Sequence, residues 1–226
     1  MQTTIISVGG SMIIPEEINI EFLKELKQIT LCHIKNNNRV ILVCGGGKIA
    51  RDYIDASRKL AKITDINADL VGIAATKLNA ELVRVIFEDT TYEKVVYNPT
   101  KKIETNKKVI IASGWEPGCS TDTDAVLLAK NFNADTIINM TNIDYVYNKD
   151  PKKHKDVTPL KDISWEDFQK IVGEEWSPGL NMPFDPIATK HAKELNLKVI
   201  IINGNNLENL SNYLEQKEFK GTTIHK

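Results

Sequence analysis

The segment RVILVCGGGKIA, residues 39–50, joins a short apolar run to three consecutive glycines. The run Arg39–Cys44 is aliphatic and β-branched without polar alternation, which predicts a strand buried on both faces. Gly45, Gly46 and Gly47 predict a turn at its end, and residues 49–60 follow with helical spacing. A buried strand that passes through a turn into a helix is typical of a parallel α/β sheet.

The same pattern occurs twice more, where Thr3–Val8 ends at Gly9-Gly10-Ser11 and residues 108–112 end at the turn 114–118. Further strands are predicted at residues 94–97, 136–140 and 198–202 and, as an edge strand, at 222–225. Helices are predicted at residues 20–34, 70–87, 122–132, 164–172 and 207–214, and another begins at Asp185-Pro186, a good N-cap and first residue. The chain is therefore predicted to form a single domain, residues 1–226, folded as a three-layer α/β/α sandwich with a mainly parallel open sheet.

The composition narrows the classes of partner. The chain has 29 basic and 30 acidic residues and a net charge of −1, which gives no electrostatic footprint for nucleic acid. No apolar run is long enough to cross a bilayer, and the N-terminus lacks the pattern of a signal peptide. The three cysteines are scattered, which favours a reducing cytoplasm over disulfides or a zinc site. We expect a cytoplasmic protein without nucleic-acid or membrane partners.

The three glycine turns predict an anion-binding edge. The carboxyl ends of parallel strands lie at one edge of a sheet, where α/β proteins bind their ligands. Glycine lets backbone N–H groups converge on an anion, and the helices that follow add their positive N-terminal ends. Each turn alone is better explained as a tight turn, but three on one edge favour phosphate binding.

Two later segments carry polar groups suited to a nucleotide. Ser120, Thr121 and Asp122 lie at a predicted helix N-terminus, where they can bind phosphate or simply cap the helix. Residues 141–147 read TNIDYVY, and Asp144 and Asp150 could hold or orient a metal–phosphate group. Tyr147 could cover an adenine.

The second turn also allows a different interpretation. Gly45, Gly47 and Ala50 match the dinucleotide pattern G-x-G-x-x-A, and Asp69 follows about twenty residues later. Against a nicotinamide-binding fold, the motif follows the second strand and leaves the other two turns unexplained. The turn is not a Walker A loop either, because Lys48 is followed by Ile49 and not by serine or threonine.

Five segments in order carry a resemblance that runs nearly end to end: VGGS, GGGKIARDYI, GWEPGCSTDTDAVLLA, TNIDYVYNKDPKK and DPIATKHAKEL. Together they resemble the amino acid kinase family, and within it the archaeal-type uridylate kinases. The resemblance implies ATP-dependent phosphorylation of UMP to UDP with Mg²⁺ in pyrimidine nucleotide synthesis, by a single α/β/α domain that assembles as a homohexamer.

The resemblance also implies roles for matching residues. The ATP site would comprise Gly9, Gly10, Ser11, Gly47, Arg51, Thr141, Asn142, Tyr147 and Asp150. The UMP site would comprise Gly46, Asp69, which would hold the ribose, and Trp115, Glu116, Pro117, Gly118, Cys119, Ser120 and Thr121. The chain departs from the family pattern at Ser7, where many members have lysine, at Trp115 and Glu116 in the third turn, and at Tyr145, where glycine is usual.

Phosphoryl transfer to a phosphate oxyanion needs positioning and positive charge more than a general base. Lys48 and Lys190 are therefore predicted to flank the transferring group, with Asp144 orienting these cations and Mg²⁺; the alternative is that both are surface lysines. Two other functions stay open at this point: another small-molecule kinase such as an isopentenyl phosphate kinase, although no histidine lies in residues 51–62, and a non-catalytic nucleotide or anion binder.

Overall fold

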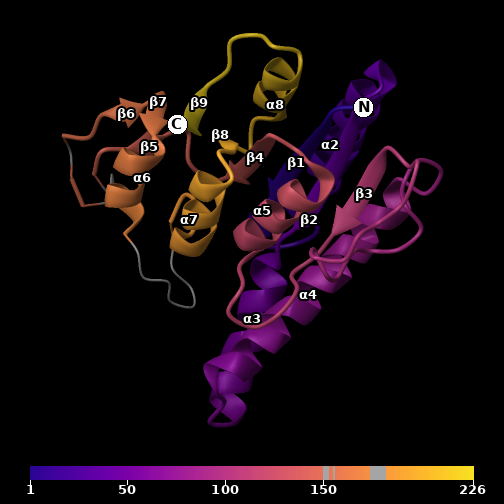
Figure 1. The fold of residues 1–226 in the computed structure, drawn as a ribbon. Coiled ribbons are helices and arrows are strands. Elements are labelled where there is room, and N and C mark those ends of the chain that lie inside the picture. The colour runs from indigo at the N-terminus through magenta and orange to yellow at the C-terminus, as the bar shows by residue number, and fades with distance from the viewer. Residues whose placement is uncertain (150–152, 155, 174–181) are drawn as a thin grey trace.

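A seven-stranded sheet forms the centre of the protein in a computed structural model, which describes residues 1–149, 153–154, 156–173 and 182–226 (Figure 1). Its strands are β1 (Thr3–Val8), β2 (Arg39–Cys44), β3 (Val109–Ala112), β4 (Thr136–Thr141), β7 (Asp162–Ser164), β8 (Lys198–Asn203) and β9 (Gly221–His225). They lie in the order β3-β2-β1-β4-β8-β9-β7, and every neighbouring pair is parallel except β8 and β9. The predicted mainly parallel α/β sheet is confirmed.

Helices cover both faces of this sheet. They are α1 (Gly10–Ile13), α2 (Ile20–His33), α3 (Gly47–Leu60), α4 (Asp65–Ile86), α5 (Thr121–Phe132), α6 (Trp165–Val172), α7 (Pro186–Glu194) and α8 (Leu207–Leu214), with a 3-10 turn at Ile34–Asn36. A separate hairpin pairs β5 (Val146–Tyr147) with β6 (Pro159–Leu160). In the described part of the chain, no helix is long and apolar enough to cross a membrane.

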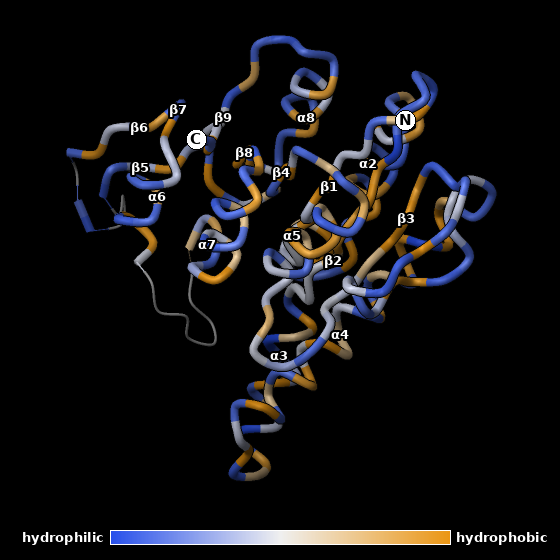
Figure 2. The backbone as a smooth tube through the Cα atoms, viewed as in Figure 1, coloured by the Kyte–Doolittle hydropathy of each residue, from blue (hydrophilic) through white to orange (hydrophobic). Residues whose placement is uncertain are grey.

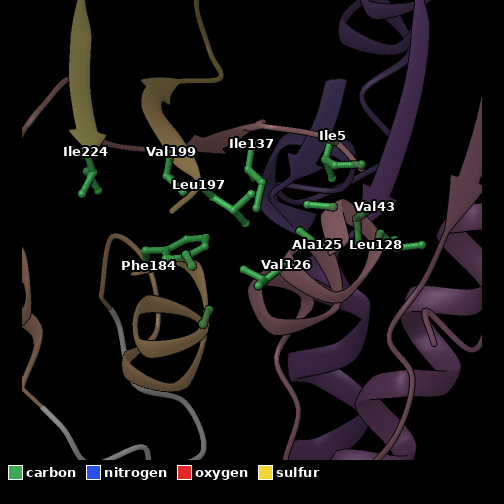
Figure 3. Packing of buried hydrophobic residues seen from close by; sticks show 14 of the residues in the cluster. Ile5, Val43, Ala125, Val126, Leu128, Ile137, Phe184, Leu197, Val199 and Ile224 are labelled. Carbon is green, nitrogen blue, oxygen red and sulfur yellow. The ribbon is translucent and has the colours of Figure 1, made fainter. Parts of the chain in front are cut away.

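The inner strands are buried on both faces, so consecutive residues pack into two hydrophobic cores on opposite sides of the sheet. Ile5, Ile137 and Val199 pack with α5, α6 and α7. Figure 3 shows their side chains on the face of the sheet toward Val126 of α5 and Phe184. Ile6, Ile138 and Ile200 pack on the other side with α1, α2, α4 and α8. Full burial of each such side chain stabilises the fold by roughly 1.5–3 kcal/mol, which explains why continuous apolar strands predict this architecture.

Two strand predictions are wrong. The C-terminal strand β9 is not an edge strand, because β7 pairs with its outer side and forms the edge instead. Residues 94–97 form no regular strand; Val96 makes only an isolated bridge to Ala112. Both outcomes depend on which partner strand is within reach, which local sequence does not encode.

Helices α3 and α4 form a long hairpin that projects from the body of the protein (Figure 1). Helix α4 begins at Asp65, before the predicted start at residue 70, because the side chain of Thr64 caps it by accepting the amide of Asn67. Helix α3 has no buried residue. Figure 2 shows apolar segments along this exposed hairpin, where Leu60 is 86% and Ile66 62% exposed.

Candidate active site

The first two glycine turns interlock at the carboxyl edge of the sheet. Strands β1 and β2 pair with Val8 opposite Cys44, so the turns that follow start side by side. A β-carbon on Gly10 would lie 2.0 Å from the backbone nitrogen of Gly47, and one on Gly47 would lie 2.4 Å from the carbonyl oxygen of Gly10. Gly47 also has φ +65°, a conformation that favours glycine. No larger residue fits at either position.

These turns leave backbone donors free. The amide of Gly9 donates to the carbonyl of Met140 at 3.2 Å, and that of Gly45 donates to Val8 at 3.0 Å. Among the described residues, no protein acceptor lies in hydrogen-bonding position for the amides of Gly10, Gly46 and Gly47. The amides of Gly46 and Gly47 lie at the N-terminal end of α3, a helix of fourteen residues, where an anion is stabilised.

Side chains of helix α4 form hydrogen bonds with both the second and the third turn. The side-chain amide of Asn79 donates to the carbonyls of Gly45 at 2.8 Å and Gly46 at 3.1 Å. One helical turn earlier, the hydroxyl of Thr76 accepts the amide of Gly114 at 2.9 Å. Asp69 accepts the amide of Gly118, in the third turn, at 2.9 Å. The third turn therefore lies beside the second, on the same helix.

Three carboxylic groups form the other end of the site, at the N-termini of α5 and α7. Ser120 caps α5 and its hydroxyl donates to Asp185, which is the N-cap of α7; Thr123 donates to the same oxygen of Asp185 at 3.3 Å. Asp122 accepts the hydroxyl of Ser7 at 3.4 Å and the amide of Asp185 at 3.3 Å. Burial, with a smaller effect of the Asp185 carboxylate, raises the pKa of Asp122 to about 7.

Asp124, two residues after Asp122 in α5, is fully buried. One of its oxygens accepts the amide of Trp115 at 3.2 Å, and its Oδ1 has no partner among the described residues. Burial raises the pKa of Asp124 to about 8, so its carboxyl group is largely protonated at neutral pH. Burial and neighbouring carboxylates raise the pKa of the Cys119 thiol to about 11, which makes it a poor nucleophile.

The fourth predicted segment follows β4. Thr141 ends the strand and its hydroxyl accepts the amide of Ile143 at 3.2 Å. Asp144 binds Lys220 at 2.6 Å and the side-chain amide of Asn203 at 2.8 Å, and these contacts lower the pKa of its carboxyl. Lys220 lies outside every predicted motif, so the cation that Asp144 holds was missed. Asn142 and Tyr147 lie in the same segment, and Asp150 lies outside the described residues.

The two predicted catalytic lysines have different surroundings. Lys48 lies in the first turn of α3 and forms ion pairs with Asp52 at 2.8 Å and Glu16 at 3.7 Å. The hydrogen bond that Lys48 donates to the carboxylate of Asp52 raises the pKa of Lys48, which keeps it charged. Lys190 is exposed in α7 and lines a groove shared with Gln169 of α6. The exposed Arg51 follows Lys48 by three residues.

Several side chains of the site were not predicted from the sequence: Thr76, Asn79, Thr123, Asp124 and Lys220. A usable signal existed for Asn79, a polar residue four positions from each of the apolar residues Ala75 and Val83 on the buried face of α4. The dinucleotide interpretation of the second turn fails, because Asp69 lies inside α4 and two successive helices separate β2 from β3. In a dinucleotide fold a strand would follow the first helix.

The fold and the free amides at its carboxyl edge define a phosphate-binding α/β protein of the nucleotide-binding type. The model of the amino acid kinase family matches residues 2–203. The chain is 32% identical over 225 residues to a uridylate kinase of Methanobrevibacter smithii, covering 98% of this chain and 99% of the relative. It is 35% identical over 207 residues to a uridylate kinase of Sulfurisphaera tokodaii, covering 90% and 91%.

The crystal structure of uridylate kinase from Archaeoglobus fulgidus superposes with a TM-score of 0.81 at 32% identity, covering 99% of this chain and all of that one. UMP kinase from Bacillus anthracis shares the fold, with a TM-score of 0.78 at 20% identity, covering 99% of this chain and 96% of that one. The chain belongs to the amino acid kinase family.

Proposed function

We propose that the protein is a UMP kinase, which transfers the γ-phosphoryl group of ATP to UMP and releases ADP and UDP for pyrimidine nucleotide synthesis. The observation that carries the proposal is the pair of adjacent glycine turns bound to one helix, α4. Free amides at the N-terminus of α3 would bind one phosphate, and the third turn would bind a second. Relatives named as uridylate kinases match nearly the whole chain.

The two nucleotides would divide the site. ATP would contact Gly9, Gly10, Ser11, Gly47, Arg51, Thr141, Asn142, Tyr147 and Asp150. UMP would contact Gly46, Asp69, Trp115, Glu116, Pro117, Gly118, Cys119, Ser120 and Thr121. Because Asp69 already accepts the amide of Gly118, it fixes the turn while its other oxygen stays available to a ribose hydroxyl.

The reaction would need no general base, because the attacking group is an oxygen of the UMP phosphate, already ionised. That oxygen forms a bond to the γ-phosphorus while the bond to the bridging oxygen of ADP breaks, and no proton moves. The residues supply position and charge: Lys48 and Lys190 would neutralise the transferring group, and Asp144 would orient the cations.

Magnesium fits the acidic end of the site. Asp122 and Asp185 form no ion pair with a lysine or arginine in the described part of the chain. Carboxylate oxygens are hard ligands, and Mg²⁺ commonly binds one or two of them together with substrate phosphates. We propose that Asp122 would hold the ion; when bound, it would neutralise charge on the phosphates.

The assembly that we propose is a homohexamer in the cytoplasm. Support for self-association comes from the α3–α4 hairpin, whose exposed apolar residues include Tyr53, Leu60, Ile66, Leu70, Leu78 and Val85. Sedimentation of the wild type should give six chains, as the family resemblance implies. A monomer at micromolar concentration would contradict this proposal.

The test of the function is an ADP-release assay with MgATP against UMP, CMP, dUMP, AMP, isopentenyl phosphate and no acceptor. We expect turnover with UMP well above every other acceptor. Turnover with isopentenyl phosphate instead would support the rival kinase. Silence with every acceptor while ATP still binds would contradict the proposal and identify the chain as a nucleotide binder.

A further inference from the structure

Helix α4 contacts both turns that would hold the reacting phosphates, although it comes after one turn in the sequence and before the other. Asn79 reaches back 34 residues to the second turn, and Thr76 reaches forward 38 residues to the third. The two side chains are one helical turn apart on one face. Both are buried, at 1% and 7% exposure.

Asn79 controls which way the peptides of the second turn face. Its side-chain amide binds the carbonyl oxygens of Gly45 and Gly46 from inside the protein. In a trans peptide the N–H group points opposite to the carbonyl group. The amides of Gly46 and Gly47 therefore point away from Asn79, and these are two of the free donors of the site.

Thr76 lies between the two turns. Its hydroxyl donates to the carbonyl of Ile73 at 2.7 Å, so its lone pair is what accepts the amide of Gly114. A β-carbon on Gly114 would lie 3.0 Å from this hydroxyl oxygen, and one on Gly46 would lie 3.6 Å from the methyl group of Thr76. The methyl group of Thr76 thus lies beside the second turn, and its oxygen binds the third.

We propose that Thr76 and Asn79 are positioning residues that set the separation and orientation of the two phosphate-binding turns, and so the alignment of donor and acceptor. The proposal rests on the proposed function and deepens it. Neither side chain needs to touch a nucleotide. Because in-line transfer depends on the distance between two bound groups, a small relative shift of the turns slows the reaction even when each nucleotide still binds.

The variants are Asn79→Leu, which keeps the size but cannot donate, and Thr76→Val, which keeps the shape but cannot accept. Asn131→Leu is the matched control for the first, because the amide of Asn131 also donates to two backbone carbonyls, those of Pro99 and Lys101. Thr30→Val is the control for the second, because Thr30 is buried and its hydroxyl has no partner in the described structure. Thr76→Ser restores the hydroxyl.

We expect Asn79→Leu to lower kcat by about 10²-fold and Thr76→Val by about 10-fold, while KM for ATP and UMP changes by less than about threefold. Affinity for a bisubstrate analogue that joins adenosine and uridine through a polyphosphate should fall in parallel with kcat, because only that ligand senses both turns at once. Thr76→Ser should keep near-wild-type kcat, and both controls should change only the melting temperature.

Variants that melt earlier but keep kcat within about twofold of wild type would overturn the proposal. So would a rise in KM for one nucleotide that accounts for the whole loss. Failure of the proposed function shows separately, as absent UMP turnover by the wild type. In that case the split between kcat and KM is measured with the acceptor that the wild type does use.

Discussion

The two ends of the site are built from different groups. At the ends of β1 and β2 the site consists of backbone: Gly10 and Gly47 touch, and the free donors are peptide amides. At the N-termini of α5 and α7 it consists of carboxyl side chains: Asp185 accepts the hydroxyls of Ser120 and Thr123, Asp122 accepts that of Ser7, and Asp124 accepts the backbone amide of Trp115.

This difference separates two kinds of sensitivity. The free donors of the backbone end are peptide amides, which do not ionise, so their charge does not change with pH, but the packed glycines cannot accept an added β-carbon. The charge of the acidic end depends on pH, because burial raises the pKa of Asp122 and Asp124 into the neutral range. Variants at each end therefore test whether the two ends differ in this way.

The largest effect is expected from Gly10→Ala. A β-carbon there would lie 2.0 Å from the backbone of Gly47, so the two turns must separate and several amide donors move together. Since one preorganised donor is worth about 10²–10³-fold in rate, turnover should become undetectable in the ADP-release assay. Gly72→Ala is the control, because its β-carbon meets only Ile54 at 3.4 Å. Wild-type turnover by Gly10→Ala would refute the interlocked arrangement.

The next largest effects are expected at Lys48 in α3 and Lys190 in α7. Their variants test which of the two lysines supplies positive charge to the transferring phosphoryl group. Lys48→Met and Lys190→Met should each lower kcat by about 10²–10⁴-fold if both flank the transferring group. Lys24→Met, at an exposed ion pair on α2, is the control. A kcat within about twofold of wild type removes that lysine from the proposed mechanism.

A smaller effect is expected from Ser120→Ala at the acidic end. It removes both the cap of α5 and the hydroxyl bound to Asp185, so stability should fall by about 1 kcal/mol and KM for UMP should rise about 10-fold. Ser164→Ala removes the equivalent cap of α6 and should cost similar stability without changing KM. Equal KM values for the two variants would show that Ser120 only caps its helix.

The smallest effect concerns pH and stability. A carboxyl whose pKa is raised on folding binds more protons in the folded state, so its contribution to stability is complete below about pH 4 and is lost as pH rises to about 8. Asp124→Asn keeps an acceptor for Trp115 and removes this dependence, so the free energy of unfolding of the variant should rise relative to that of the wild type between pH 5 and pH 8. Urea unfolding at both pH values measures the change. Asp89→Asn, on the surface, should give a curve parallel to wild type, and a parallel curve for Asp124→Asn would contradict the prediction.

The backbone end was predictable and the acidic end mostly was not. Strands β1 and β2 and their glycine turns have local signals, because continuous apolar runs and consecutive glycines each determine conformation at their own positions. The sequence also predicts Asp185 as a helix cap, correctly. It does not show that this cap meets Ser120, 65 residues earlier, or that Asp144 binds Lys220, 76 residues later. Such pairs depend on strand order, which local patterns leave open.

The contact between Gly10 and Gly47 also depends on the register in which β1 pairs with β2. It forms only when Val8 lies opposite Cys44, and a slip of β1 against β2 by one residue would exchange the two faces of the strand and separate the turns. Both strands bury residues on both faces, so hydrophobicity alone distinguishes the two registers weakly. A nucleotide bound at these turns would therefore stabilise correctly paired molecules over those with a slipped register.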